Sequence, residues 1–194
     1  MTKYAGTIPG PAEVTEVAHQ SAAVVVGVGR TAADPHVTAR LVALVDELGL
    51  DTIADLWSVM PAGTLPGALW RLYVLREWVV RSPVTASREY AAGMRHTHFD
   101  HVVAGAAEPP GPDELRTLAD DILRRIYRGD LAVALERAAA FCRVISAGRA
   151  ELAHDADALD PGRARTETEQ AASLLTTAEE LDAAAAAWRR DALY

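Results

Sequence analysis

Several features that would identify a redox compartment or a membrane segment are missing from this chain. It has one cysteine, Cys142, so neither an intrachain disulfide nor a cysteine-based metal cluster can form within one copy. Cys142 falls on an apolar helical face, where we expect a small buried hydrophobe rather than a reactive thiol. The longest aliphatic run, Ala22 to Val26, is far too short to span a bilayer, and no apolar segment of a signal peptide follows Lys3. We therefore expect a cytoplasmic protein that does not enter a membrane.

Positive charge is also in deficit. The chain has 19 Lys and Arg against 27 Asp and Glu, which gives a formal net charge of -8 at pH 7 and repels nucleic acid at long range. The densest basic group consists of Arg124, Arg125 and Arg128. Asp120 and Asp121 precede it within one turn, so the local field is mixed. A solvated helix face is favoured over a phosphate-binding patch, and we expect no nucleic-acid partner.

Motifs of common catalytic sites are absent as well. The chain has no GxSxG elbow, no phosphate loop and no HExxH helix. Residues 27–32 fit the alanine-ended form of the dinucleotide fingerprint, but at the required distance Asp46 and Glu47 lie inside an amphipathic helical pattern. The glycines of this segment are more typical of the end of a first helix that begins near Pro11. We identify no catalytic residue, and the sequence favours a non-enzymatic protein without excluding catalysis.

Helix punctuation, in contrast, recurs along the chain. A polar capping residue stands directly before proline at Asp34-Pro35 and at Ser82-Pro83, and proline suits the first position of a helix. Residues 65–81 are hydrophobic on most of the helical circumference, which places this helix at the centre of a bundle. We predict an all-α helical bundle of about seven or eight helices with a long C-terminal helix.

The distribution of proline and glycine suggests how the bundle is organised. We expect an N-terminal helical group over residues 1–106, a Pro/Gly linker over 107–112, and C-terminal helices over 113–194 that pack on the same core as one compact domain. Small and apolar residues then recur in steps of three and four at Ala171, Leu174, Ala178, Leu181, Ala185 and Trp188. Such a narrow seam suits either intramolecular packing or a dimer contact, so a homo-oligomer is one expected assembly.

Arg76 is the most unusual residue of the central helix, because a helical projection places it in the middle of the widest apolar face. A second apolar stripe is formed by Trp70, Val74 and Trp78. A guanidinium taken out of water needs a carboxylate partner. Candidate partners from the second half are Asp120, Asp121 and Glu136. Arg76 would then either hold the two halves together as an ion pair or recognise an acidic ligand.

Residues 96–101 spell HxHxDH, which is the metal-ligand motif of the metallo-β-lactamase superfamily. That superfamily needs a β-strand before the motif and further ligands after it, whereas here residues 85–92 are typical of a helix. The match covers only these six residues, and we interpret it as a coincidence.

A helix continued through this string would sort its side chains into two faces. His98 and His101 would share the inner face with Tyr90, Met94 and Val102. His96 and Asp100 would point outward with Glu89. Inner histidines three residues apart could bind a divalent transition metal, or could be partly buried groups satisfied by hydrogen bonds. The candidate ligand-binding residues are therefore Arg76, Tyr90, His98 and His101, with the two histidines as weak metal candidates and no other cofactor expected.

The stretch Ala54–Ser82 resembles a segment of uncharacterised helical proteins from bacteria with GC-rich genomes. The resemblance rests on Leu56-Trp57, on residues 65–73 and on Arg76-Glu77-Trp78. It implies a helical fold in a bacterial cytoplasm and transfers no catalytic residue. The favoured function is a non-enzymatic protein-binding or regulatory module, which we expect to be a homodimer. The alternative is a metal- or small-ligand-binding bundle with an internal polar pocket between Arg76 and the two histidines.

Overall fold

A computed structural model describes residues 10–31, 35–98, 100–106 and 108–194, and these residues form ten helices and no strand. The first five are α1 (Pro11–Thr31), α2 (Pro35–Val42), α3 (Leu44–Leu48), α4 (Leu50–Trp57) and α5 (Leu65–Arg81). The others are α6 (Pro83–Met94), α7 (Asp100–Ala104), α8 (Pro112–Tyr127), α9 (Leu131–Ala156) and α10 (Pro161–Arg189). The all-α fold with a long C-terminal helix is confirmed.

The number of helices exceeds the expected seven or eight because two segments are divided. The pattern after Asp34 predicts one helix, but a turn at Ala43 separates α2 from α3. The segment after Met94 also turns before α7 begins. At the other end, α1 begins at Pro11 as expected and continues past Gly27 to Thr31, because a glycine inside a helix costs only about 1 kcal/mol.

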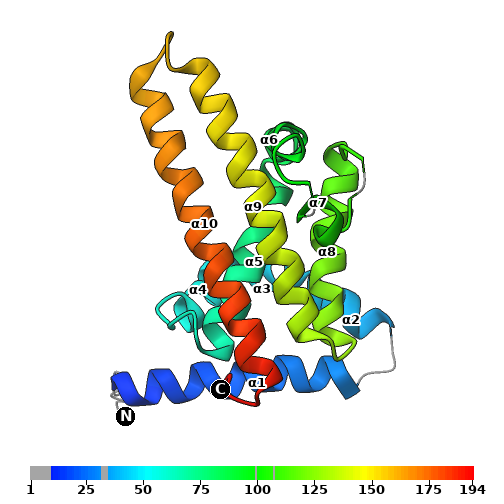
Figure 1. Cartoon of the computed structure of the whole chain (residues 1–194). Helices are drawn as coiled ribbons and strands as arrows, with labels where there is room; N and C mark the ends of the chain where they lie inside the picture. Colours follow the sequence, from blue (N-terminus) through cyan, green and yellow to red (C-terminus); the bar gives the residue numbers. More distant parts are fainter. Residues whose placement is uncertain (1–9, 32–34, 99, 107) are drawn as a thin grey trace, which may run out of the picture.

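The two longest helices form an antiparallel hairpin that organises the molecule. Figure 1 shows α9 and α10 side by side, with the far end of the hairpin rising beyond the other helices and α1 lying across the base. Helices α6, α7 and α8 pack against α9, whereas α1 contacts α5 and α8. Asp160 caps the start of α10 by accepting a hydrogen bond of 3.0 Å from the backbone N–H of Arg163.

The alanine-rich seam of α10 packs within the chain. Its six residues are buried or half-buried along α9, and the Ser146 hydroxyl of α9 donates a hydrogen bond of 2.7 Å to the Ala171 carbonyl. Cys142 of α9 is fully buried, as its helical position predicts, and burial raises the pKa of its thiol to about 12. This seam is therefore occupied by an intramolecular helix pair.

Helices α6 and α9 touch backbone to backbone. A Cβ atom built on Gly93 would lie 1.8 Å from the Val144 carbonyl oxygen, and one built on Gly148 would lie 1.7 Å from the Glu89 carbonyl oxygen. Only glycine fits at either position, because any larger side chain would force the helices apart. The close crossing brings the side chain of Glu89 within reach of Arg149, the residue after Gly148.

One hydrophobic core includes residues on both sides of the predicted linker. Leu69 and Tyr73 precede the linker, Phe141 and Leu181 follow it, and all four belong to the same buried cluster. Where the linker is described, its Pro110 carbonyl accepts a hydrogen bond of 2.7 Å from the Ser87 hydroxyl.

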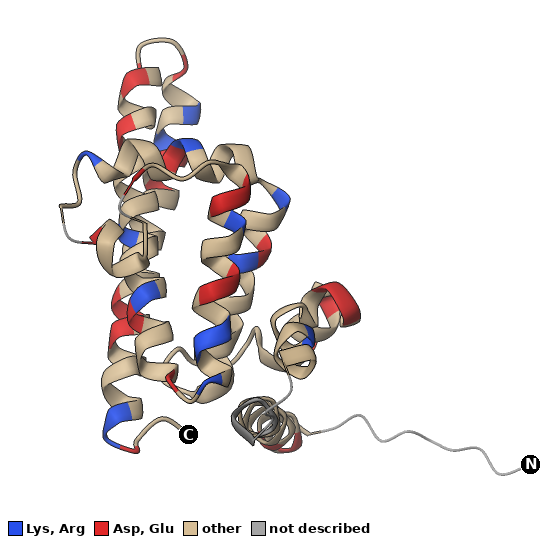
Figure 2. Ribbon diagram, turned by 90° about the vertical axis from the view of Figure 1, so that its right-hand side faces the viewer, with Lys and Arg blue, Asp and Glu red and all other residues tan. Residues whose placement is uncertain are grey.

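Acidic and basic residues are interspersed along the helices (Figure 2). On α8, Arg124 lies 2.6 Å from Asp121 and 3.8 Å from Asp120, and Arg125 lies 3.9 Å from Asp130. The arginine cluster thus faces its own carboxylates, as expected from the sequence. Among the described helices, none combines the length and the apolar character needed to cross a membrane.

Candidate functional site

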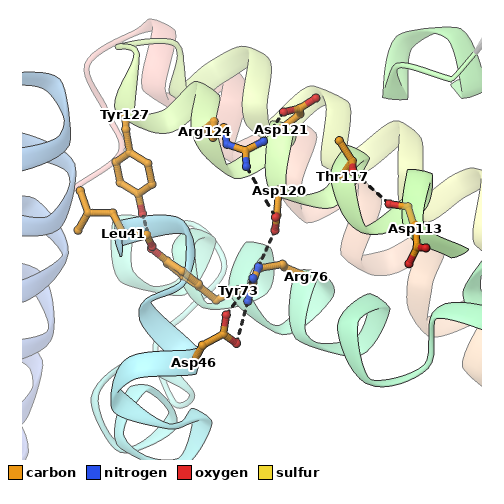
Figure 3. A network of polar contacts seen from close by, with 10 residues as sticks. All are labelled: Leu41, Asp46, Tyr73, Arg76, Asp113, Thr117, Asp120, Asp121, Arg124 and Tyr127. Atoms are coloured by element: carbon orange, nitrogen blue, oxygen red, sulfur yellow. Dashed lines mark hydrogen bonds and ion pairs between the residues drawn. The ribbon is translucent and has the colours of Figure 1, made fainter. Parts of the chain in front are cut away.

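Arg76 of α5 lies between two carboxylates from different helices (Figure 3). Its Nε donates a hydrogen bond of 2.8 Å to Asp120 of α8, and its two Nη atoms donate to both oxygens of Asp46 of α3 at 3.1 and 3.0 Å. The side chain is only 8% exposed. Burial lowers the pKa of the guanidinium, but the two carboxylates together outweigh burial and raise it. The predicted partner Asp120 is confirmed, and Asp46 is a partner that the sequence did not reveal.

A pair of tyrosines continues this polar cluster towards α2. Tyr73, one turn before Arg76 on α5, donates a hydrogen bond of 2.6 Å to the Leu41 carbonyl, and its hydroxyl also meets that of Tyr127. Burial raises the pKa of Tyr73 to about 12 and raises the pKa of Tyr127 well above its ordinary value. The cluster therefore joins α2, α3, α5 and α8 through neutral tyrosines and one buried cation.

The space beside Arg76 is small. A cavity lined by Leu72, Arg76 and Phe141 has a volume of about 10 Å³, which is enough for at most one water molecule. Phe141 also packs against Tyr90, with a distance of 5.3 Å between the two ring centroids. The cavity beside Arg76 is too small for the ligand-binding polar pocket expected between Arg76 and the two histidines.

The helix that precedes the histidines, α6, ends at Met94 and does not continue through them, so the two faces that a continued helix would give them do not form. The backbone N–H groups of Arg95 and His96 close tight turns on the carbonyls of Ala92 and Gly93, at 3.3 and 3.0 Å. The Thr97 hydroxyl donates a further hydrogen bond of 2.9 Å to the Gly93 carbonyl. These local bonds compete with helix continuation, as threonine side chains commonly do.

The turn separates the candidate metal ligands. His98 is exposed, and the His101 ring bonds through Nδ1 to the Thr97 carbonyl. His96 meets Glu151 at 3.0 Å on the surface, and Phe99 of the same string lies outside the described residues. Within the described part of the chain, no group of three or more His, Cys, Asp or Glu side chains is placed to hold a metal ion.

Tyr90 does come close to His101, but through the backbone. Its hydroxyl donates a hydrogen bond of 3.3 Å to the His101 carbonyl, and burial raises its pKa well above the ordinary value. Two other face assignments are wrong because the helix ends early and α6 crosses α9: Val102 is 58% exposed and Glu89 is buried.

Glu89 belongs to a second buried ion pair. Its carboxylate accepts hydrogen bonds from Nε and Nη2 of Arg149 at 2.8 to 3.2 Å, and the two side chains are 9% and 12% exposed. The Arg149 guanidinium also lies over the Trp78 ring, 5.4 Å from its centroid. Neither helical periodicity nor spacing predicts this pair, because it depends on the crossing of α6 and α9.

A second buried carboxylate is less completely satisfied. Glu77 of α5 pairs with Arg81 one turn later, and the Arg81 side chain is 65% exposed. The other oxygen of Glu77, Oε2, is the one buried side-chain nitrogen or oxygen in the described residues that has no hydrogen-bond partner. Such an oxygen forfeits hydration without a compensating bond.

An apolar groove lies at the base of the molecule, between α1 and the C-terminal residues. We call it the basal groove; it has a volume of about 470 Å³. Its lining includes Ala23, Val26, Gly27, Leu65, Trp188 and Leu193. The C-terminal residue is fixed beside it, because the Leu65 N–H at the start of α5 donates a hydrogen bond of 2.8 Å to the Tyr194 carbonyl.

No protein-family model, no curated protein and no solved structure matches this chain. The fold class therefore comes from the structure alone: the described residues form an all-α bundle built around one long helical hairpin. The buried Arg76 and the half-buried Arg149 each join two or more of its helices, and an apolar groove opens at its base.

Proposed function

We propose that this chain is a non-catalytic binding protein that associates with a second copy of itself through the basal groove and the exposed face of α1. The observation that supports this proposal is the apolar groove of about 470 Å³ between the C-terminal residues and α1, a helix that also carries exposed apolar side chains outside the groove lining. Val17 and Val24 of α1 are 50% and 61% exposed, and Tyr194 is 76% exposed. Apolar side chains gathered beside a groove are typical of protein interaction surfaces.

A second copy is the partner that fits the shape of this surface. A two-fold dimer uses the same patch on both subunits, so the patch must present both a ridge and a hollow. Val17 and Val24, two helical turns apart, form a ridge along the same helix that provides one wall of the groove. Ala23 and Gly27 are small enough to let a partner helix approach closely, and 21 residues give α1 a length of about 30 Å.

Sedimentation velocity from micromolar to millimolar concentration tests the proposal. The wild-type chain should dimerise, and Val24→Glu should weaken the dimer at least about tenfold, because a carboxylate would be buried in an apolar contact. Val84→Glu is the matched control, since Val84 on α6 is 70% exposed and distant in sequence from the groove. A wild-type chain that stays monomeric throughout, or equal effects of the two substitutions, would refute this interface.

The bacterial cytoplasmic setting and the absence of a nucleic-acid partner belong to the same proposal. They are supported by the single cysteine, the net charge of -8 and the mixed charges of the arginine cluster. The second candidate function is binding of a small ligand. A cleft on the second apolar stripe of α5 favours it, at a place separate from both Arg76 and the histidines.

A further inference from the structure

The second apolar stripe of α5 borders a cleft that the proposed dimer does not use. The cleft has a volume of about 290 Å³ and lies where α5, α9 and α10 meet. Trp70, Val74 and Trp78 line it from α5, and the other two helices contribute Cys142, Leu174 and Thr177. Both tryptophans remain half-buried and Val74 is 37% exposed, so this stripe is only partly covered by the fold. We call this site the tryptophan cleft.

Two arginines also line the tryptophan cleft, and each is already neutralised. Arg71 donates from Nε to Glu180 at 2.7 Å and from Nη1 to the Gly67 carbonyl at 2.9 Å. Arg149 is held by Glu89 in the buried pair described above. Two cations and two carboxylates leave the cleft without net charge. A charged ligand would therefore lose hydration without gaining an unpaired opposite charge.

A donor group of Arg71 is nevertheless unused. Nη2 of Arg71 has no acceptor among the described residues, although Arg71 is 22% exposed and lines the cleft. A ligand oxygen could accept from it without displacing Glu180. The two indole rings offer flat apolar surfaces.

We propose that the tryptophan cleft binds an uncharged, flat aromatic molecule of one or two fused rings that bears a carbonyl oxygen. The volume sets the size, because pockets for drug-sized ligands begin at about 300 Å³. The tryptophans set the aromatic character, the balanced ion pairs exclude net charge, and the free N–H of Arg71 selects an acceptor. This site is independent of the basal groove.

Titration with 2-acetylnaphthalene, followed by calorimetry and by the indole N–H resonances, tests the proposal. Saturable binding should shift the signals of Trp70 and Trp78. Trp57, which is buried and donates to Ser21 at 3.0 Å, should not respond. Trp188 reports on the basal groove, so a shift confined to Trp188 would place the ligand there and overturn the assignment.

Related ligands and substitutions test each part of the proposal separately. The charged 2-naphthoate and the acceptor-free naphthalene should each bind at least about tenfold more weakly than 2-acetylnaphthalene. Val74→Phe should abolish binding by filling the cleft from its rim, whereas Val84→Phe on α6 should not change it. Arg71→Met should remove the preference for the carbonyl compound.

Three outcomes would overturn the inference. They are tighter binding of the carboxylate than of the ketone, equal binding by the wild type and Val74→Phe, and absence of saturable binding. An unchanged Trp57 resonance and helical dichroism spectrum would show that each variant still folds. Val24→Glu should bind 2-acetylnaphthalene as the wild type does, so failure of the dimer proposal and failure of this one are distinguishable.

Discussion

Replacement of Arg76 by alanine would test whether the buried ion-pair cluster holds the two halves of the chain together. The substitution leaves Asp46 and Asp120 facing one another without their shared cation. Removing one partner of a buried ion pair typically costs about 3–5 kcal/mol. Here the carboxylate side chains are 47% and 25% exposed, so water can partly hydrate them after the substitution. We therefore expect the free energy of unfolding to fall by about 3 kcal/mol.

Urea denaturation at 25 °C and neutral pH measures this change, and a double-mutant cycle divides it between the two carboxylates. The coupling of Arg76 with Asp120 should exceed that with Asp46, because the Asp120 side chain is the less exposed and its ion pair is less screened. The matched control is Arg40→Ala. Arg40 also pairs with an acidic side chain of α3, Glu47, but is 75% exposed, so no measurable change is expected.

The reasoning fails if Arg76→Ala changes the free energy of unfolding no more than Arg40→Ala does. That result would mean that hydration of the guanidinium in the unfolded chain offsets all three hydrogen bonds. A stabilised Arg76→Ala variant would go further, because desolvation would then outweigh the ion pairs in the native protein.

Three further predictions concern two glycines, the buried tyrosine pair and Glu77. Gly148→Ala should destabilise the fold by about 1–3 kcal/mol, because the new Cβ atom would meet the α6 backbone. Gly27→Ala, where the new Cβ atom would meet open space, should stabilise the fold by about 0.5–1 kcal/mol. Thermal melts should therefore show melting temperatures shifted in opposite directions. Tyr73 has a pKa of about 12 in the folded chain against an ordinary 10.0, so its contribution to stability is complete below pH 10 and is lost as the pH rises towards 12. Absorbance at 295 nm should show that Tyr73 and Tyr127 ionise only as the protein unfolds. Ionisation of both near pH 10 with the fold intact would contradict this prediction. Glu77→Leu removes a buried oxygen that has no partner, so the free energy of unfolding should stay unchanged or rise by about 1 kcal/mol. A large decrease in this free energy, measured by urea denaturation, would show that the ion pair with the exposed Arg81 matters more than the burial of Glu77.

Local signals in the sequence located most helices and one of the two ion-pair partners. Proline at the first helical position marks the starts of α1, α2, α6 and α10. Asp120 was one of three candidate partners for Arg76, because Arg76 lies in the middle of the widest apolar face of its helix. The burial of Arg76 made a carboxylate partner necessary, and only a few acidic residues of the second half were suitable.

Asp46 was missed because candidate partners were sought only in the second half of the chain, whereas Asp46 lies in the first half, on α3. The turn at Ala43, which separates α2 from α3, was also not predicted, because neither proline nor glycine marks it. The histidine segment was wrong for a related reason. Short-range hydrogen bonds to Gly93 ended α6 before the string, and their strength relative to helix continuation is not evident from periodicity.

The pair of Glu89 and Arg149 shows how tertiary packing can create a site that no local pattern predicts. Gly93 and Gly148 are ordinary helical positions in the sequence, yet their lack of side chains allows two helices to touch. That contact buries Glu89, which fixes Arg149, and Arg149 in turn covers one face of Trp78. A residue at Gly148 with a side chain would therefore disturb the tryptophan cleft as well as the helix crossing. The ligand site and the close packing of α6 on α9 depend on the same two glycines.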